Sequence, residues 1–367
     1  MRSVAIEMTA RCNQKCTYCY NSWREDGGRE MGELPHDELV GLIDRVVADQ
    51  TLTHITLTGG EPFLRKDLNA VIDRINGHGL GVTIISNGGA VRDDVIERLG
   101  QQKVHYVQVT LAGGDEATHD KVAGKGSFGR AVSVLRRLRA VGVPIGGSFL
   151  VTKESYRHAQ AVMERFVELG VDHVAFNRFN PSGFSTDAMH ALMPTRSMIV
   201  EALGVANAIA GEHDLSVICT MPIPPCVIDE SSFPNIRFGY CSAGVEEGEY
   251  AIGPDGALRL CTLQKQRLGS VLEDTVSDIV ARGGAEAFRR QVPDFCKGCM
   301  HEHTCLGGCG ASAEWIFGSV DELDPFVAQH VYPDFAKRTS PEIAEDGRIP
   351  LSGLRLNRAP DAQTRAQ

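Results

Sequence analysis

The sequence contains no long apolar run and no excess of positive charge. No stretch of its 367 residues approaches the roughly 18 consecutive apolar residues that a membrane-spanning helix needs. Residues 1–7 lack the apolar core of an export signal, so we predict a cytoplasmic location. The 37 lysine and arginine residues are outnumbered by 47 aspartate and glutamate residues, and the resulting net charge of −10 disfavours broad contact with a phosphate backbone. These absences predict a protein that binds neither membranes nor nucleic acids.

Cysteine is missing from residues 20–218 and is concentrated on either side of that gap. Three of the 11 cysteines lie between Cys12 and Cys19, and eight lie between Cys219 and Cys309. A secreted disulfide framework is normally a short chain behind an export signal, and this chain is neither. In a reducing compartment, clustered thiolates are most simply explained as metal ligands. The sequence therefore predicts a metalloprotein.

The first 180 residues alternate between short β-rich runs and amphipathic helical stretches. We predict strands at residues 4–8, 55–58, 82–86, 106–111, 145–151 and 173–176. We predict helices at residues 37–47, 67–75, 93–99, 130–141 and 156–169. Strands that alternate with helices in this way are parallel and have right-handed connections. The pattern predicts an α/β fold, a partial (β/α)6 TIM-like barrel, whose active site lies at the carboxyl ends of the strands.

Composition divides the chain into four parts. The predicted barrel occupies residues 1–185, and a connector with a helix at 197–210 and a proline-rich segment occupies residues 186–235. Residues 236–330 are rich in cysteine and have little continuous hydrophobic periodicity, so we expect bound metal to organise them. The remaining residues, 331–367, form a polar tail. We find no internal repeat beyond the alternation of strands and helices.

Three cysteines directly follow the first predicted strand, at Cys12, Cys16 and Cys19. Three thiolates on one short loop can hold a cubane of four irons, which leaves one iron open to a small molecule. Buried free thiols, or a zinc site completed by a distant histidine, are the alternatives.

Together with the motifs around it, this loop resembles the radical S-adenosylmethionine (SAM) superfamily. The segment 59–62, with the sequence Gly-Gly-Glu-Pro, looks like the GGEP motif of that family, and 86–88 resembles its TNG turn, with Ser86 for Thr. Segment 108–111 and His119 resemble the fourth-strand region of the branch that modifies peptides and sulfatases. Within that region Thr110 and Ala112 replace the Ser and Asp of the family.

The resemblance implies a 4Fe-4S cluster on Cys12, Cys16 and Cys19, with SAM bound at the open iron. It implies that Glu61 holds the amino group of SAM and that Tyr18 borders the adenine. The other cofactor contacts that it implies are Gly59, Gly60, Ser86, Asn87, Gln108 and Thr110. Arg178, just past the sixth strand, can pair with the carboxylate of SAM or cap the rim of the barrel. The sequence identifies no further catalytic residue.

The C-terminal cysteines resemble the SPASM extension of radical SAM enzymes, because they follow the order C…G-x4-C…C-x2-C-x5-C-x3-C. Gly256 is the glycine of this pattern. The resemblance implies two auxiliary iron–sulfur clusters. One would be held by Cys241, Cys261 and Cys309, and the other by Cys296, Cys299 and Cys305.

One position departs from the SPASM pattern. The family has a seventh cysteine after an Asp-Pro pair, and this chain has Phe326 there. The second auxiliary cluster therefore lacks a thiolate, and water, substrate or a side chain would fill its site; the candidate side chains are Asp324, His301 and His303. For the fourth ligand of the first auxiliary cluster, Cys226 is the candidate and Cys219 a weaker one. Zinc is the alternative for the whole region, because paired cysteines also form tetrahedral zinc sites.

The resemblance implies an oxidoreductase that cleaves SAM to a 5′-deoxyadenosyl radical, which then removes a hydrogen atom from the substrate. It implies an external electron donor of the flavodoxin or ferredoxin type, and auxiliary clusters that accept a second electron. We predict oxidation or cross-linking of a ribosomally made peptide. The first strand starts near residue 4, so we expect no fused leader-binding domain and include a separate recognition protein among the partners.

Two other functions stay open at this stage. One is dehydrogenation or decarboxylation of a small molecule in a sugar or aminocyclitol pathway. The other is a non-enzymatic iron–sulfur electron-transfer or zinc-binding protein. Sulfatase maturation is disfavoured, because Thr262 stands where those relatives have an aspartate.

Overall fold

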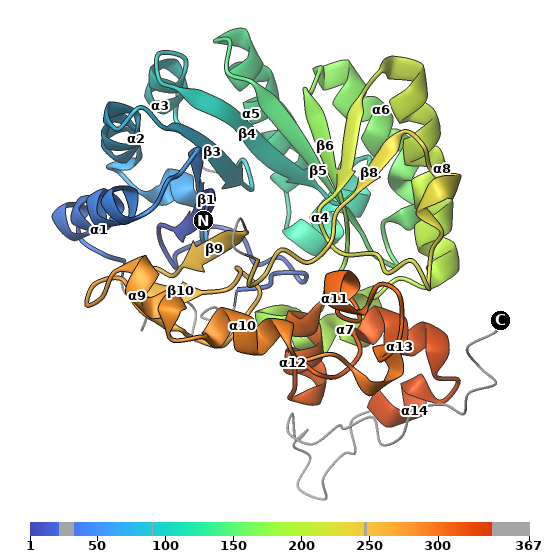
Figure 1. Ribbon diagram of the computed structural model, residues 1–367. Helices are drawn as coiled ribbons and strands as arrows, with labels where there is room; N and C mark the ends of the chain where they lie inside the picture. The colour runs from blue at the N-terminus through green and yellow to red at the C-terminus, as the bar shows by residue number, and fades with distance from the viewer. Residues whose placement is uncertain (22–32, 90, 246–247, 340–367) are drawn as a thin grey trace, which may run out of the picture.

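The computed structural model describes residues 1–21, 33–89, 91–245 and 248–339, and its centre is one mixed β-sheet (Figure 1). The described part contains an 11-stranded sheet in the order β11-β10-β9-β1-β2-β3-β4-β5-β6-β7-β8. Its strands are β1 (Ser3–Glu7), β2 (His54–Thr58), β3 (Gly81–Ser86), β4 (Val104–Leu111), β5 (Ile145–Val151), β6 (His173–Arg178), β7 (Ser216–Cys219), β8 (Ile236–Phe238), β9 (Glu249–Ile252), β10 (Ala257–Arg259) and β11 (Gly269–Ser270). Neighbours from β9 through β1 to β8 are parallel, and β10 is antiparallel to both β9 and β11.

Helices alternate with the first strands and cover the outside of the curved sheet (Figure 1). They are α1 (His36–Asp49), α2 (Leu68–Gly77), α3 (Asp93–Leu99), α4 (Glu116–Ala123), α5 (Ser127–Ala140), α6 (Ala159–Leu169), α7 (Met189–Leu192) and α8 (Arg196–His213). The C-terminal helices are α9 (Val276–Ala281), α10 (Gly284–Arg289), α11 (Glu302–Cys305), α12 (Gly310–Phe317), α13 (Pro325–Val331) and α14 (Phe335–Thr339). Short 3-10 helices are η2 (Pro62–Leu64), η3 (Tyr156–His158), η4 (Gly183–Ala188), η5 (Glu230–Ser232) and η6 (Asp294–Cys296).

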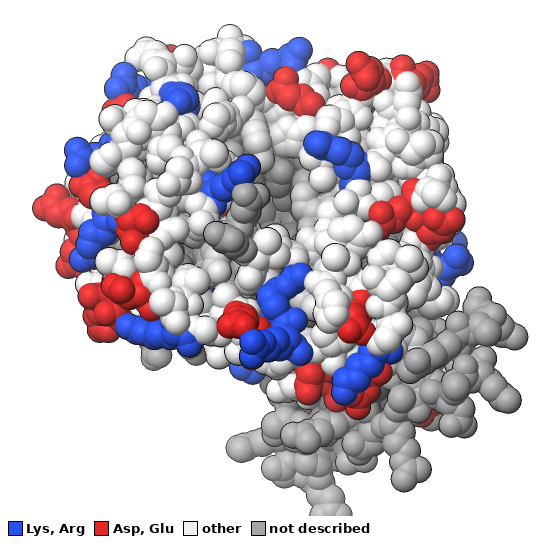
Figure 2. All heavy atoms as spheres, in the orientation of Figure 1, with Lys and Arg blue, Asp and Glu red and all other residues white. Residues whose placement is uncertain are grey.

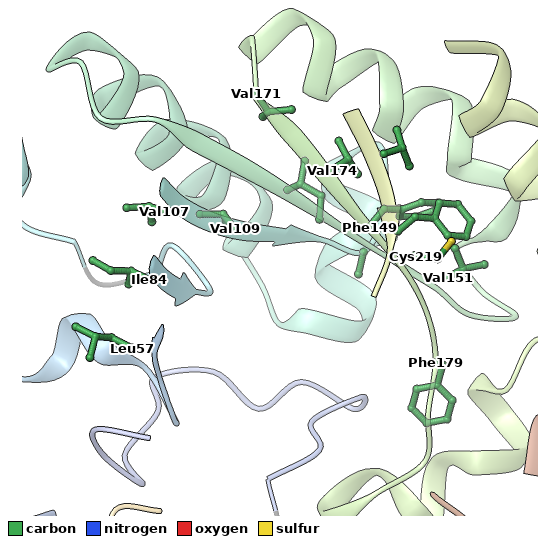
Figure 3. Packing of buried hydrophobic residues seen from close by; sticks show 14 of the residues in the cluster. Leu57, Ile84, Val107, Val109, Phe149, Val151, Val171, Val174, Phe179 and Cys219 are labelled. Carbon is green, nitrogen blue, oxygen red and sulfur yellow. The ribbon is translucent and has the colours of Figure 1, made fainter. Parts of the chain in front are cut away.

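The predicted α/β partial barrel is confirmed. Strands β1 to β6 and helices α1, α2, α3, α5, α6 and α8 lie within a few residues of their predicted positions. Hydrophobic spacing explains this agreement: in α1 the buried residues are Leu39, Leu42, Ile43 and Val46, which form one stripe of a helix. Figure 3 shows strand residues such as Val107 and Val109 within the resulting core.

The sequence did not predict strands β7 to β11. β7 and β8 lie in the expected connector and extend the sheet beyond β6. β9 and β10 come from the cysteine-rich region, and β9 pairs in parallel with β1, with Ser3 opposite Glu249. Strands of two to four residues carry too little periodicity to be recognised, and their pairing depends on distant parts of the chain. Helix α4 was missed as well, since its eight residues bury only His119, Val122 and Ala123.

The C-terminal helices α10 to α14 gather at one end of the barrel, below the sheet in Figure 1. The predicted polar tail starts in this region: α14 packs through Phe335, whose ring lies 6.5 Å from that of Phe317. Residues 340–367 of the predicted tail lie outside the described residues. Among the helices that the model describes, none is both long enough and apolar enough to cross a bilayer. On the face shown in Figure 2, acidic and basic side chains are interspersed around a central hollow.

Candidate active site

The cysteine loop leaves β1 and is fastened to helix α4. The amide of Thr17 donates to the carbonyl of Val122 at 3.0 Å, and the amide of Cys19 donates to the carbonyl of Cys16 at 3.2 Å. Cys16 is buried, and the other two cysteines of the loop are partly exposed. Backbone hydrogen bonds therefore hold the loop that carries all three cysteines.

Two glycines after β2 pack directly on the start of the cysteine loop. The amide of Gly60 donates to the carbonyl of Thr9 at 2.7 Å, and the amide of Glu61 donates to the carbonyl of Arg11 at 2.9 Å. Gly59 has a φ of +125°, which favours glycine, and a Cβ on Gly60 would overlap the carbonyl of Arg11. This close approach of two backbones explains why both positions are glycine.

We expect Gly60→Ala to lower the free energy of unfolding by about 1–3 kcal/mol, because its methyl group must displace backbone atoms of the cysteine loop. Chemical denaturation followed by circular dichroism measures this change. Gly41→Ala is the matched control, since Gly41 lies in α1 with no atom within 4 Å of the added Cβ. Equal effects of the two substitutions would contradict the close packing at Gly60.

Glu61 connects the turn after β2 to the turn after β3. One carboxylate oxygen accepts hydrogen bonds from the amide of Phe63 at 3.1 Å and from the hydroxyl of Ser86 at 2.8 Å. The other accepts from the amide of Asn87 at 2.8 Å. The residue is fully buried. These three hydrogen bonds hold Glu61 between the two turns, and its contact with the amino group of SAM stays a prediction.

Asn87 completes the connection back to the cysteines. Its side-chain amide contacts the sulfur of Cys12 at 3.5 Å and donates to the side chain of Asn13 at 2.9 Å. Its carbonyl oxygen accepts from the amide of Gly89 at 2.7 Å. The loops after β1, β2 and β3 thus form one hydrogen-bonded unit.

A pocket at the carboxyl ends of these strands brings the motifs together. The pocket is open to solvent on one side. The predicted residues that line it are Cys12, Cys16, Tyr18, Cys19, Gly59, Gly60, Ser86, Asn87 and Thr110. The pocket therefore joins residues from four separate loops and strands.

Three predicted contacts do not line this pocket. Glu61 lies behind the two turns. Gln108 is half-buried and lies two residues before Thr110 on β4. Arg178 is buried elsewhere: its guanidinium pairs with Asp324, and its Nε donates to the carbonyl of Pro222 at 2.9 Å. Pairing with Asp324 favours the structural alternative for Arg178 over a contact with SAM.

Asn21 and His119 are among the pocket residues that the sequence prediction of the site did not include. Asn21 donates its side-chain amide to the carbonyl of Gly59 at 2.8 Å, and its buried carbonyl oxygen has no hydrogen-bond partner in the described part of the chain. His119 lines the pocket from α4, and its Nδ1 accepts from the amide of Ala112 at 3.1 Å. His119 could have been found from the sequence, because it lies in a segment that resembles the family. No sequence pattern marked Asn21 as a site residue.

Burial raises the pKa of Glu61 from 4.5 to about 7, although its hydrogen bonds favour the charged form. An acid with a raised pKa in the folded state stabilises the fold fully below pH 4.5, and this contribution is lost as the pH rises through about 7. We therefore expect the wild type to lose stability relative to Glu61→Gln across that interval. Denaturant unfolding at several pH values measures the difference. A difference that is constant with pH would contradict the raised pKa of Glu61.

The C-terminal cysteines fall into two groups. Cys241, Cys261 and Cys309 form the first: burial raises the pKa of Cys261 to about 12 and of Cys241 to about 11, and in both cases the charge of Cys309 raises it further. This group is the one that the SPASM resemblance implies. Asp324 holds the backbone of Cys309 in place, because its carboxylate accepts a hydrogen bond from the amide of Cys309 at 2.8 Å.

Cys226 is the candidate fourth ligand of the first group, and its electrostatic neighbours include thiols of the second. Burial raises the pKa of Cys305 to about 11, and the charge of Cys226 raises it further. Burial also raises the pKa of Cys226, and the charge of Cys299 adds to this rise. The cluster that Cys226 joins stays a prediction.

The other candidate ligands are engaged elsewhere. Asp324 binds Arg178 and accepts hydrogen bonds from the amides of Cys309 and Phe326, both at 2.8 Å. The side chain of His303 is 83% exposed and pairs with Glu302. Cys219 is fully buried in the hydrophobic core (Figure 3). Its setting is that of a structural thiol.

Within the described ranges, no three His, Cys, Asp or Glu side chains are arranged to hold a single metal ion. A zinc site needs such convergence on one ion, whereas each thiolate of an iron–sulfur cubane binds a different iron.

A partial α/β barrel with three cysteines on the loop after its first strand is the architecture of a radical SAM enzyme. The family model described as "Radical SAM superfamily" matches residues 6–166, so this part of the chain is similar to that superfamily. The cysteine-rich part that follows is consistent with a SPASM domain.

Two relatives with the same name resemble most of the chain. It is 29% identical over 333 residues to "Mycofactocin maturase MftC" of Mycobacterium ulcerans, with 88% of this chain and 86% of the relative covered. It is 28% identical over 342 residues to the protein of the same name from Mycobacterium tuberculosis, with 90% and 84% covered.

Solved structures show the same fold. Streptococcus suis SuiB superimposes with a TM-score of 0.70 at 16% identity, covering 89% of this chain and 76% of SuiB. The structure "Native anSMEcpe with bound AdoMet and Cp18Cys peptide" has a TM-score of 0.67 at 17% identity and covers 91% and 98%. At these identities the likeness establishes the fold alone.

The residues of the pocket fit an iron–sulfur cluster with SAM. Three thiols supply iron ligands, and the peptide groups of the glycine turns supply hydrogen-bonding groups without side-chain obstruction. The unpartnered carbonyl oxygen of Asn21 is an available acceptor for a cationic amino group.

Proposed function

We propose that this chain is a radical SAM oxidoreductase that modifies a ribosomally made peptide by oxidation or cross-linking. The observation that carries the proposal is the pocket shared by the three cysteines and the turns after β2 and β3. An electron-transfer protein would need the cysteines but not the two turns.

In this proposal Cys12, Cys16 and Cys19 hold the 4Fe-4S cluster. SAM lies against the glycine turn, the Ser86–Asn87 turn, Tyr18 and Thr110, which line the same pocket. When bound, the cluster supplies the electron that cleaves SAM to methionine and a 5′-deoxyadenosyl radical, which takes a hydrogen atom from the substrate.

His119 orients a ligand without adding charge. Burial lowers its pKa to about 4, so the ring is neutral near pH 7. Because Nδ1 accepts a hydrogen bond from Ala112, Nε2 carries the proton and serves as a donor. The charge of His119 therefore does not change at pH values well above its pKa of about 4.

The peptide substrate is supported by the relatives. MftC is named a maturase, SuiB has been seen bound to its precursor peptide SuiA, and anSMEcpe has been seen with a bound peptide. Auxiliary clusters held by the C-terminal cysteines would supply the acceptor for the second electron of this oxidation, and solvent would take the proton. A flavodoxin or ferredoxin type of donor provides the first electron, and a separate leader-recognition protein is a further proposed partner.

Incubation of the anaerobically reconstituted protein with SAM, dithionite and a candidate precursor peptide tests the proposal. We expect 5′-deoxyadenosine and a peptide that has lost two hydrogen atoms, both measured by mass spectrometry. A reaction without SAM is the control. Formation of 5′-deoxyadenosine only with small-molecule substrates would overturn the peptide assignment and leave the superfamily chemistry in place.

A further inference from the structure

A groove lined by arginines crosses the outer face of α5. This helix lies on the outside of the sheet, between α3 and α6 (Figure 1). Two adjoining hollows on it share Gly129, Ser133 and Arg137, and together we call them the α5 groove. Among the described residues, those that line the groove include no acidic side chain and five arginines, namely Arg92, Arg130, Arg136, Arg137 and Arg165.

Part of this positive charge is not neutralised by the chain itself. Three of the arginines have a carboxylate partner: Arg92 pairs with Asp94, Arg137 with Asp93 and Arg165 with Glu168. Arg130 donates to the carbonyl of Lys125 at 3.2 Å, and Arg136 is exposed. Neither of these two has a carboxylate partner in the part of the chain that the structure describes. The groove therefore keeps an excess of positive charge on a chain whose net charge is −10.

The shape of the α5 groove is fixed by contacts within the chain. Arg137 donates through both of its terminal nitrogens to the carbonyl of Val91 at 3.1 Å, which holds the segment after β3 against α5. Gly129 and Ser133 lie one helical turn apart, and a Cβ added to Gly129 would meet no atom within 4 Å. Small residues at these two positions leave the surface of the helix open between the longer arginine side chains.

One wall of the α5 groove is the turn after β3, which also touches the cysteine loop. Gly88 and Gly89 line the groove. Gly89 approaches the cysteine loop so closely that a Cβ on it would lie 2.6 Å from Nδ2 of Asn13. Asn87, the residue before Gly88, places its side-chain amide 3.5 Å from the sulfur of Cys12. A single turn of the chain therefore separates the groove from a proposed ligand of the cluster.

The charge of the α5 groove selects an acidic occupant, and its position decides between two kinds. None of the described residues that line the groove also lines the pocket. A peptide substrate bound in the groove would have the turn after β3 between itself and the pocket. An electron donor needs only to come close to the cluster, because an electron can pass through the intervening turn. The position therefore favours an electron donor over the precursor peptide.

We infer that the α5 groove is the docking surface for the acidic electron donor, a protein of the flavodoxin or ferredoxin type. The inference rests on the proposed function, which requires such a donor. In the step that docking serves, the donor is oxidised by one electron and the cluster on Cys12, Cys16 and Cys19 is reduced by one, and no bond forms or breaks. A local positive field is needed, because a chain of net charge −10 otherwise repels an acidic partner.

Charge reversal tests the inference through binding, independently of catalysis. Arg130→Glu/Arg136→Glu replaces the two arginines of the groove that have no carboxylate partner. Arg45→Glu/Arg237→Glu makes the same change of net charge at exposed arginines of α1 and β8, and it is the matched control. The probe is a purified flavodoxin of strongly negative net charge. Biolayer interferometry with the anaerobically reconstituted full chain measures its affinity.

We expect the groove variant to bind the flavodoxin at least about tenfold more weakly than the wild type at low ionic strength, and the control to stay within about twofold. Added salt should weaken binding by the wild type more than binding by the groove variant, because salt screens exposed charges. Circular dichroism should show that both variants are folded. Equal losses of affinity in the two variants, or a wild type that does not bind the flavodoxin, would overturn the inference.

A comparison of two reductants separates docking from the chemistry in the pocket. With reduced flavodoxin, the groove variant should form 5′-deoxyadenosine at least about tenfold more slowly than the wild type. With dithionite, a small reductant that needs no docking surface, the two rates should be equal. A variant that is equally impaired with dithionite would show that the groove acts through the fold or the cofactor, which contradicts docking.

The remaining outcomes distinguish the inference from the proposed function. If the wild type forms no 5′-deoxyadenosine with either reductant, the proposed function fails and the inference fails with it. If the wild type is active with dithionite and the groove variant keeps full affinity for the flavodoxin, the inference alone fails. A groove variant that loses affinity only for a fluorescent precursor peptide would assign the groove to the peptide and overturn the inference.

Discussion

Replacement of Cys12, Cys16 and Cys19 by alanine is expected to abolish cleavage of SAM. The three thiols line the pocket together with the turns after β2 and β3, and nothing else in that pocket can ligate iron through sulfur. Formation of 5′-deoxyadenosine should fall to the uncatalysed level, a loss of at least about 10⁶-fold on the usual scale of enzymatic rate enhancements. Liquid chromatography of anaerobic reactions measures this loss, and iron analysis should show one cluster fewer.

Cys219→Ala is the matched control for this experiment. Cys219 is a cysteine of the same chain that is buried in the hydrophobic core and is not among the residues that line the pocket. We expect the control to retain its iron and its cleavage activity. Undiminished cleavage in the triple variant would remove the basis for the proposed function.

Breaking the ion pair between Arg178 and Asp324 is expected to be the most destabilising single change outside the hydrophobic core. Both side chains are completely buried, so removal of one leaves an uncompensated charge in a region without water. Asp324→Ala should lower the free energy of unfolding by about 3–5 kcal/mol. Chemical denaturation followed by circular dichroism measures the change.

Asp324 also fixes the backbone at Cys309 and Phe326, so its loss should reduce iron binding by the C-terminal cysteines. Glu286→Ala is the control, because its pair with Arg290 lies on the surface and contributes little. If Asp324→Ala and Glu286→Ala had equal effects on stability, the ion pair would not join the two regions as described.

The barrel and the first cysteine cluster could be predicted because their signals are local. The helical stripe of α1 and the alternation in β4 are visible within a dozen residues. Cys12, Cys16 and Cys19 fall within one loop, so their proximity follows from covalent spacing alone. The same holds for the glycine turn at Gly59 and Gly60.

The roles of single charged groups could not be predicted in this way. Arg178 and Asp324 are 146 residues apart, and no sequence pattern joins them. Glu61 looked like a ligand contact because of its motif, but its three hydrogen bonds come from residues that only the folded turns bring within reach. A buried charge is costly unless an opposite charge or a hydrogen-bond partner lies beside it, and the folded structure decides which group that is.

The sequence by itself determined the order of parallel strands, the loop that carries three thiols and the turns that face it, because each depends on neighbours along the chain. The folded structure was needed to show that β9 extends the barrel sheet and that Arg178 pairs with Asp324, away from the pocket. Those contacts join segments separated by tens to hundreds of residues. Their partners are selected by the packing of the whole chain, which short-range spacing does not encode.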